Sequence, residues 1–486
     1  MKTGKNKYRD GGYITVYVAL SLGIIISLIT TMLIAARNRT IRFQTECVAD
    51  LGINSLLAEY NRELLKQYKL FFIDSAYGSG NGNPENVAKH LIHYMNINYD
   101  ECSSGILGKG KDLTACRADN ALISGISYAS DNKGRVLRYQ IDRYMKAIYG
   151  LDMISDSINN EKDLEAYLSD YDAYCGERDS ANGQVDEIMN ELNSNLEEDE
   201  EPYSISNPAD SVGTLTPGTA LYYAVKDPAA MRFGRTDISG LISGRNIRDG
   251  EGLRPYQKAP DDLVSRQLFY KYIFDQCGYY SDEKDGSALT YQIEYLIVGK
   301  DSDMENMEEI ADKIFKTRYA INMAYLMSSG SKQMEAEEMA LAATSAIGLP
   351  ELTEAVKWTI LFAWGYAESA KDMRILYDGH GLTLIKTDAS WNTPLAQMVA
   401  FAACLDDYTP PGGDMDYKKY LTLFLESADY DRTTMRLMDI MEMDIRLTPG
   451  NSNFRMDNAI YQFYATANIS SAYNYDCSIK RFATYE

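Results

Sequence analysis

Two histidines stand at a spacing that could bind a metal ion. His90 and His93 lie three residues apart in a stretch that is predicted to be helical, so both imidazoles would lie on one face. Glu85 is the nearest further carboxylate in the sequence, and the HExxH frame of zinc hydrolases is absent. We therefore interpret both histidines as partly exposed helix residues and predict no metal site.

The sequence also lacks the compact motifs that mark many hydrolases and metalloproteins. No GxSxG nucleophile elbow occurs, and none of the seven cysteines forms a CxxC pair. The alternating glycines of Gly78–Gly82 do not open the strand-turn-helix of a phosphate-binding loop, so they are interpreted as a flexible turn. Acidic pairs are abundant, but spacing alone does not separate a glycosidase pair from surface charge. We predict no catalytic residue and no cofactor.

The most informative segment is an uncharged stretch near the amino terminus. About 24 residues from Tyr13 to Ala36 carry no charge, and as an α-helix they would span about 36 Å, enough to cross a bilayer. A cleaved secretory signal has an apolar region of only about 7–15 residues, so we favour a retained membrane helix. A removed signal stays an alternative. Small residues that would let a second helix approach closely in the membrane are Ala19, Ser21 and Gly23.

The helical pattern continues beyond the membrane segment. From Arg37 to Leu70 there is no proline, and Gly52 is the only glycine. Apolar residues recur at steps of three and four, which predicts a helix with one buried face; they are Ala49, Ile53, Leu56, Leu57, Tyr60, Leu64 and Tyr68. A single rod is therefore expected, with a lipid-buried first half and a second half that packs on a globular body.

Charge is distributed unevenly along the chain. Residues 1–42 contain seven basic residues and one acid, whereas the remainder has 41 basic and 69 acidic residues, a net charge of −28. Such an acidic body lacks the basic footprint that nucleic-acid binding requires, so no nucleic-acid partner is expected. The basic flanks of the apolar segment suit lipid headgroups, and the expected partner is the bilayer. Four basic residues precede the segment and three follow it, so charge alone leaves the topology open.

Two segments carry a family resemblance. GGYITVYVALSLGIIISLITTMLIAAR and the following ECVADLGINSLLAEYNRELLKQYKLFFID resemble the amino-terminal region of TadE/TadG-like proteins, the minor pilins or pseudopilins of tight-adherence (Tad, Flp-type) systems. More narrowly, the chain resembles the uncharacterised DUF5702 family of Gram-positive proteins. EYLIVGKDSDMENMEEIADKIFKTRYAINMAYL also looks like that family.

The resemblance implies a membrane topology and a processing site. It implies a single-pass protein of the cell membrane, with a cytoplasmic amino terminus and an extracellular carboxy-terminal body. A leader peptidase of the prepilin type would cut between Gly12 and Tyr13. The fifth residue after that bond is Tyr17, where pilins carry glutamate, so the resemblance favours a tip or assembly component over a shaft subunit.

The predicted fold class is α+β. An amino-terminal transmembrane helix continues into a long amphipathic helix and leads to a mainly helical body with a small antiparallel sheet. The expected segments are a basic cytoplasmic leader (1–12), a transmembrane helix (13–36), an amphipathic helical rod (37–74), a first α+β segment (75–183), an acidic and Gly-rich linker or insertion (184–258) and a second α+β segment (259–486).

Periodicity predicts the individual elements of the body. Helices are expected over 85–95, 135–149, 160–174, 305–327, 332–347, 351–377, 394–405 and 416–443. A β-hairpin is expected around Ala118–Asn120, a strand over 288–298, and two antiparallel strands at the carboxy-terminal end with a turn near Asn468–Ser471.

The preferred functional hypothesis is a non-enzymatic, membrane-anchored surface component of a Tad-like pilus or secretion apparatus. Its expected partners are pilus or secretion-system membrane proteins. One alternative is a membrane-tethered extracellular enzyme that acts on cell-wall or other polymer, which would require a deep polar cleft with perturbed carboxylates. Another is an anchored structural surface protein unrelated to pili.

Overall fold

The computed structural model describes residues 11–103, 114–149, 161–195, 218–228 and 234–485, together with 202, 204, 215, 216 and 231. These residues fall into two compact units. The first comprises Met1–Val136, Arg248–Lys258 and Thr448–Glu486, and the second comprises Leu137–Ile247 and Ala259–Leu447. The segment boundaries expected from composition remain predictions. The units follow a different division, because each gathers stretches that are distant in the sequence.

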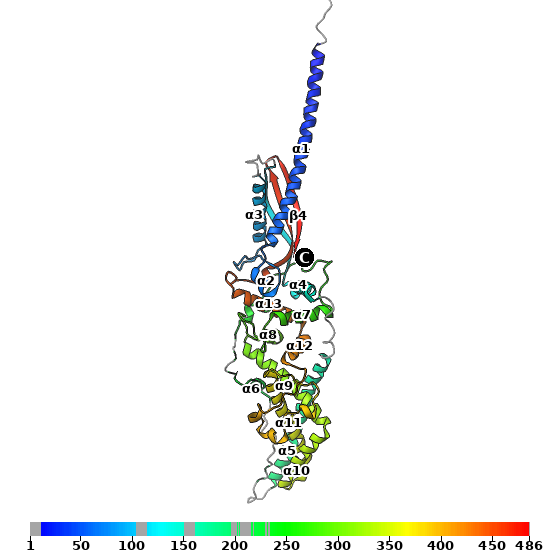
Figure 1. Ribbon diagram of the computed structural model, residues 1–486, viewed down its shortest axis with the longest axis vertical. Coiled ribbons are helices and arrows are strands. Elements are labelled where there is room, and N and C mark those ends of the chain that lie inside the picture. The colour runs from blue at the N-terminus through cyan, green and yellow to red at the C-terminus, as the bar shows by residue number, and fades with distance from the viewer. Residues whose placement is uncertain are drawn as a thin grey trace, which may run out of the picture. The chain divides into compact units, whose positions relative to one another are not determined.

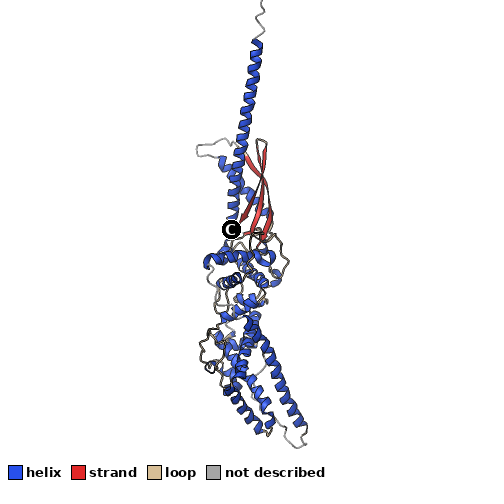
Figure 2. Ribbon diagram, turned by 90° about the vertical axis from the view of Figure 1, so that its right-hand side faces the viewer, coloured by secondary structure: helices blue, strands red, loops and turns tan. Residues whose placement is uncertain are grey.

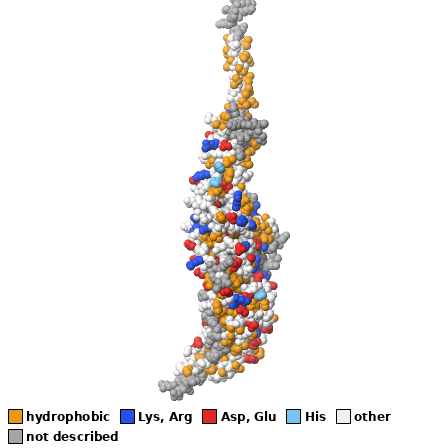
Figure 3. All heavy atoms as spheres, turned by 60° about the vertical axis from the view of Figure 1, so that its left-hand side comes forward, with side chains coloured by type: hydrophobic (Ala, Val, Ile, Leu, Met, Phe, Trp, Pro, Cys, Tyr) orange, Lys and Arg blue, Asp and Glu red, His pale blue; other side chains and the backbone are white. Residues whose placement is uncertain are grey.

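The first unit begins with the long helix α1 (Gly11–Leu57). Figure 1 shows its first half extending beyond the other elements of the unit, and its second half running beside α3 (Pro84–Ser103) and β4 (Tyr475–Thr484). The side chains of the first half are mostly apolar and exposed, and they are the orange spheres along that part of the helix in Figure 3. By length and composition, α1 could cross a membrane, although a signal sequence would satisfy the same criteria.

The helix ends earlier than the expected rod. α1 ends at Leu57, a turn follows, and a separate short helix, α2 (Arg62–Tyr68), begins after it. The Asn61 side chain caps α2 by accepting a hydrogen bond from Leu64 N at 3.0 Å, and Asn61 N donates to Phe72 O. Asparagine stabilises a helix start better than a helix interior, so the expected continuous rod is replaced by two helices.

A four-stranded antiparallel sheet forms the other layer of the first unit (Figure 2). Its central strand β3 (Ala459–Ser471) pairs with β2 (Cys116–Tyr128), with β4, and over two residues with β1 (Ile73–Asp74). The two carboxy-terminal strands are confirmed, but their turn lies at residues 472–474 because Asn468–Ser471 still pair with β4 as part of β3. The predicted hairpin around Ala118–Asn120 is wrong. Both residues lie inside the single strand β2, and its pairing with β3 shifts register between them.

One face of the sheet packs on α1 and α3. The inward residues of β3 alternate along the strand as expected for a sheet with one covered face, and they include Phe463, Ala465, Ala467 and Ile469. The helices contribute Ile41, Val48, Ile53, Leu56, Val87, Leu91 and Met95 to the same core. The predicted buried face of the amphipathic helix is thereby confirmed at Ala49, Ile53 and Leu56.

The second unit is helical. Its helices are α5 (Glu161–Ser194), α6 (Thr219–Ala224), α7 (Leu263–Gln276), α8 (Gln292–Val298), α9 (Asp303–Ser328), α10 (Gly330–Ala346), α11 (Thr353–Tyr377), α12 (Tyr417–Ser427) and α13 (Tyr430–Arg446), with most of α4 (Asp131–Tyr149). Short 3₁₀ segments include Ile238–Gly240, Pro350–Leu352, Asp388–Ser390 and Leu395–Cys404. The α+β fold class is confirmed.

Helix α11 is the centre of this unit. Every residue from Thr359 to Tyr377 is buried, so the helix is covered on all sides. Its buried residues include charged ones, such as Glu368 and Asp372, which must find partners inside the protein. Those partners define the polar network described below.

Several predicted elements of the second unit differ from the structure. The strand expected over 288–298 is the helix α8, because its buried residues Ile293, Tyr295, Leu296 and Ile297 pack among helices rather than in a sheet. The helix expected over 416–443 is two helices, separated where Asp429 caps α13. α5 continues through Gln184 to Ser194, so the first residues of the expected linker are helical. Its acidic run, 197–201, lies outside the described residues.

Candidate functional site

The apolar half of α1 has the chemistry of a lipid-facing helix. Three of its hydroxyl groups donate to carbonyls of the preceding turn: Ser21 Oγ to Val18 O at 3.0 Å, Thr30 Oγ1 to Ile26 O at 2.8 Å and Thr31 Oγ1 to Ser27 O at 2.8 Å. These polar groups therefore need no water as a partner. Such internal satisfaction is what a helix in hydrocarbon requires.

The three small residues predicted to pack in the membrane do not share one face. Ala19 and Gly23 are four residues apart and lie on the same side of α1, whereas Ser21 lies on the other side. Apart from its chain neighbours and the backbone of α1 itself, no described atom lies within 4 Å of where a Gly23 Cβ would stand, so the position is open to a partner. The geometry groups Ala19 with Gly23 as a pair of small residues four apart.

The predicted processing site lies at the start of the same helix. Gly12 and Tyr13 belong to the first turn of α1, and the Tyr13 side chain is exposed. Thr15 Oγ1 donates to Gly12 O at 2.9 Å. A peptidase would therefore have to unwind this turn to reach the bond. The basic residues of the expected leader lie outside the described part of the chain.

Polar contacts hold the second half of α1 against the sheet. Arg481 Nε of β4 lies 2.6 Å from Asp50 Oδ1, and Tyr485 OH donates to Leu57 O, the last residue of the helix, at 2.7 Å. Gly52 lets α3 approach: a Cβ there would lie 3.0 Å from Met95 Cγ and 3.2 Å from Leu91 Cδ1. The apolar half of α1 is thereby continuous with a helix firmly packed on a folded unit.

Glu59, just after α1, gathers three side chains. Its carboxylate accepts hydrogen bonds from Tyr77 OH and Tyr94 OH, both at 2.7 Å, and lies 2.8 Å from His90 Nδ1. The His90 ring stacks on Tyr77 with a centroid distance of 4.0 Å. His93 is exposed and does not join this cluster. Within the part of the chain that the structure describes, no group of three His, Cys, Asp or Glu side chains is placed to hold a metal ion.

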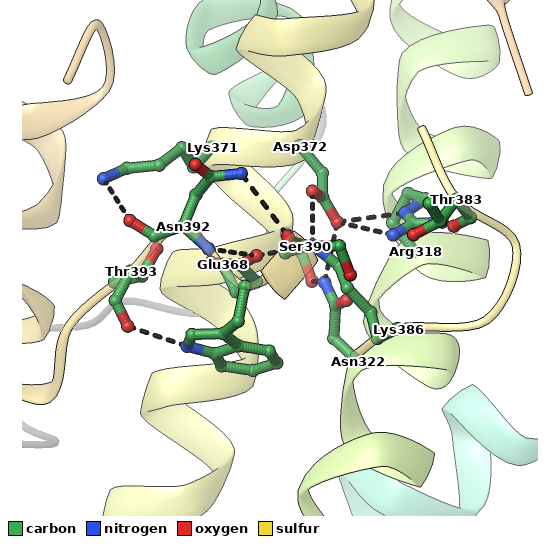
Figure 4. A network of polar contacts seen from close by, with 12 residues as sticks. Arg318, Asn322, Glu368, Lys371, Asp372, Thr383, Lys386, Ser390, Asn392 and Thr393 are labelled. Carbon is green, nitrogen blue, oxygen red and sulfur yellow. Dashed lines mark hydrogen bonds and ion pairs between the residues drawn. The ribbon is translucent and has the colours of Figure 1, made fainter. Parts of the chain in front are cut away.

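The second unit contains a buried network of charged residues (Figure 4). Lys386 Nζ donates to Asp372 Oδ1 at 2.8 Å and to Glu368 Oε1 at 2.5 Å. Arg318 Nε donates to Asp372 Oδ2 at 3.0 Å, and Asn322 Nδ2 donates to the same oxygen at 3.0 Å. Two cations thus meet two anions, and the cluster is balanced in charge.

This network fixes an irregular segment to two helices. Arg318 of α9 also donates to Thr383 O at 2.8 Å, and Asn392 N donates to Glu368 of α11 at 3.0 Å. Trp364 Nε1, also on α11, donates to Thr393 O at 2.7 Å. Residues 383–393 are therefore anchored through buried polar atoms. We interpret the network as structural, because its charged groups point at one another and not into an open space.

Three carboxyl groups of the second unit have raised pKa values. Burial raises the pKa of Glu294 to about 7, while hydrogen bonds from Tyr280 N and Tyr417 OH act against the rise. Burial likewise raises the pKa of Asp439 to about 6 and that of Asp312 to about 6. Shifted carboxyls of this kind would be expected in an active site. None of the three lines either of the pockets described for the second unit, whose linings include Arg436 in one and Gly412 in the other.

Sequence reasoning missed the buried network and the shifted carboxyls. Asp372 and Glu368 lie within the helix predicted over 351–377, and a charged residue in a helical pattern usually indicates an exposed position. Apolar residues occur on every side of this helix. That pattern predicts a completely buried helix, whose charged residues must then be paired inside the protein.

The matched family covers most of the second unit and the central strand of the first. Residues 198–471 match the family of unknown function DUF5702. The chain belongs to the DUF5702 family. Comparisons with curated proteins and with solved structures give no match. The DUF5702 match includes α7 to α13 and β3, whereas α1 and its apolar half lie before it.

Proposed function

We propose that this DUF5702 protein is a non-enzymatic, membrane-anchored surface component of a Tad-like pilus or secretion apparatus, of the pseudopilin or minor-pilin type. Its amino terminus lies in the cytoplasm and its body lies outside the cell. Its partners are the bilayer and membrane proteins of that apparatus.

One observation carries the proposal. A single helix has an exposed apolar half and a second half that packs on an antiparallel sheet, with Ile41, Val48 and Leu56 in the shared core. At about 1.5 Å per residue, the 47 residues of α1 span about 70 Å, of which a bilayer core needs about 30 Å. In a pilin-type subunit the first helix is divided in the same way, with a first half in the membrane and a second half packed on the globular domain.

The geometry also supports lateral association. Ala19 and Gly23 present a pair of small residues on one side of the apolar half, where a second membrane helix can approach closely. Membrane helices gain little from hydrophobic burial against one another, so close backbone packing is the main source of their attraction. A partner helix of the apparatus would occupy that side.

The first test is protease shaving of intact cells that express the full chain with a carboxy-terminal tag. The amino terminus of the membrane-retained fragment is then read by mass spectrometry. The proposal expects loss of the tag and a retained fragment that begins at Tyr13. A retained fragment that still carries the leader would agree with surface anchoring but contradict pilin-type processing. A protected tag would place the body in the cytoplasm and contradict the proposal.

The second test distinguishes a pilus component from an unrelated anchored protein or a tethered enzyme. The full chain is purified from membranes in an uncharged detergent, and co-purifying proteins are identified. The proposal expects membrane proteins of a pilus or secretion system. Their absence from a preparation whose tag-shaving result is positive would favour one of the two alternatives.

A further inference from the structure

A basic pocket lies in the second unit, at the junction of α8, α9, α12 and α13. Its volume is about 360 Å³, and its lining includes four cations, Lys300, Lys313, Arg432 and Arg436. Two acidic residues, Glu309 and Asp429, also line it, so the local charge is positive. The body as a whole has a large excess of acidic residues. Local clustering of cations against that background is a feature that needs a physical reason.

The cations of the pocket are not matched by ion pairs. Among the described residues, no ion pair involves any of these four side chains. Asp429 instead caps α13, where its Oδ1 accepts from Arg432 N at 2.7 Å. Burial lowers the pKa of Lys313, and the nearby charge of Arg436 lowers it further, although Glu309 raises it. A bound anion would relieve this repulsion between cations.

Arg436 is held in place before any ligand arrives. Its Nη1 donates to Leu296 O at 2.8 Å and to Ile297 O at 2.7 Å, at the carboxy-terminal end of α8. Gly299 makes room for it, since a Cβ there would lie 2.3 Å from the guanidinium carbon, and its φ of +77° also favours glycine. A fixed guanidinium loses little freedom when an anion binds.

The backbone that carries Lys300 is fixed as well. Lys300 N donates to Asn306 Oδ1 at 2.9 Å, and Asn306 Nδ2 donates to Lys300 O at 3.1 Å. Asn306 is fully buried in α9. The loop between α8 and α9 thus presents its lysine from a rigid base, while α9 and α13 present the other cations from regular helices.

We propose that this pocket binds a phosphate group. Arginine recognises phosphate oxygens through paired N–H donors, and lysine supplies point charge. The pocket volume lies at the lower end of small-molecule sites, so it has room for a phosphate and part of the group attached to it. The phosphate could belong to a small phosphomonoester or to a phosphodiester polymer. This inference does not depend on the proposed pilus role.

Calorimetric titration of the full chain in an uncharged detergent tests the inference. The probes are inorganic phosphate, glycerol 3-phosphate and a poly(glycerol phosphate) chain, with sodium chloride at matched ionic strength as a blank. Saturable binding of at least one phosphate probe is expected. Tighter binding of glycerol 3-phosphate would identify a monoester site, and tighter binding of the polymer, per phosphate, would identify a diester site.

Variants localise the binding to the pocket. Lys313→Gln and Arg432→Gln should each raise the dissociation constant about tenfold, because each removes a charge-assisted contact. Lys418→Gln makes the same change of charge on an exposed residue of α12 outside this pocket, and it should leave the constant unchanged. Circular dichroism checks that each variant is folded. Absence of saturable binding to all three probes, or equal weakening by Lys418→Gln, would overturn the inference.

Discussion

Lys386 and Asp372 form an ion pair that is closed off from solvent. The Lys386 ammonium lies 2.8 Å from Asp372 Oδ1, and the two side chains have exposed fractions of 1% and 0%. Arg318 occupies the other oxygen of Asp372 from α9, with Nη2 at 2.9 Å. The Asp372 carboxylate of α11 thus joins Lys386, which lies in an irregular segment, to Arg318 of α9.

Removal of either partner should strongly destabilise the second unit. Lys386→Met removes the cation that pairs with Glu368, and Asp372→Asn removes the carboxylate that pairs with Arg318. An uncompensated buried charge costs about 3–5 kcal/mol. Peptide-resolved hydrogen exchange should show loss of protection in residues 383–393 and α11. Lys418→Met, which alters an exposed lysine of α12, provides the control and should leave protection intact.

The pKa of Asp372 lies below its ordinary value, and this shift affects the pH at which acid begins to destabilise the second unit. Burial would raise the pKa, but the charges of Arg318 and Lys386 outweigh burial and lower it. The native state therefore holds the proton less tightly than the unfolded state. Stability from this group is present above the unfolded pKa and is lost as the pH falls through the folded value. Acid unfolding of α11 should accordingly begin only below about pH 4, the usual range of an aspartate.

Glu294 should make the second unit less stable as the pH rises. Burial raises its pKa to about 7, from an ordinary value of 4.5. The native state binds this proton more tightly than the unfolded state, so the stabilisation is complete below about pH 4.5 and is lost by about pH 7. The full difference is about 3 kcal/mol.

Glu294→Gln tests this pH dependence. The amide mimics the neutral carboxyl, so the variant should gain stability over the parent between pH 5 and pH 8. Thermal unfolding at both pH values, with exchange of α8 peptides as the local readout, measures the gain. Glu305→Gln replaces an exposed carboxylate of α9 and should show no such trend. A constant difference between Glu294→Gln and the parent at both pH values would contradict the prediction.

Gly52 should be the least tolerant glycine of α1. A Cβ at this position would press on Met95 and Leu91 of α3, and a valine would add two further carbons to that contact. We expect Gly52→Val to destabilise the first unit by about 1–3 kcal/mol through overpacking. Gly23→Val is the matched control, since no atom of another described element lies within 4 Å of its Cβ position. Hydrogen exchange of α3 and β4 peptides reports the difference.

The sequence predicted most of the helices because their periodicity is strong and their ends are marked. Ser302 caps α9, and its side chain accepts from Glu305 N, which matches the expected start within two residues. Interior caps were harder to recognise. Asn61 and Asp429 each begin a new helix where periodicity alone continues the old one, so two expected long helices became four shorter ones.

Strand prediction succeeded only where tertiary pairing agreed with local pattern. β3 and β4 alternate and are joined by a short turn, and both were predicted. The segment around Gln292 has strand-like residues but is a helix, because its neighbours are α9, α12 and α13 and no strand edge is available to it. The pairing of β2 with β3 joins residues about 350 positions apart, which no local pattern contains.

The residue types of the candidate site could be recognised in the sequence, but their arrangement in space could not. The apolar segment and its small residues follow directly from residue types, and the structure only separates Ser21 from Ala19 and Gly23. The basic pocket required the structure. Lys300 and Lys313 are separated by an acidic stretch, and Arg436 lies more than 100 positions further along the chain, so no run of positive charge marks them.

The side of α1 that carries Ala19 and Gly23 should determine association with the proposed membrane partner. Ala19→Leu and Gly23→Leu would each hold a second helix away from the backbone, and recovery of the partner from membranes should fall several-fold. Ser21→Leu adds similar bulk on the other side of the same helix and should leave recovery unchanged. Quantitative mass spectrometry of the co-purified proteins measures the effect.

Insertion must be checked for each variant, because loss of a partner could also follow from failure to reach the membrane. Leucine favours the bilayer, so all three variants should be shaved by external protease as the parent is. Equal loss of the partner from all three would show that α1 associates without a preferred side. Selective loss from Ser21→Leu would place the interface on the opposite face, where the Ser21 hydroxyl already bonds to Val18 O.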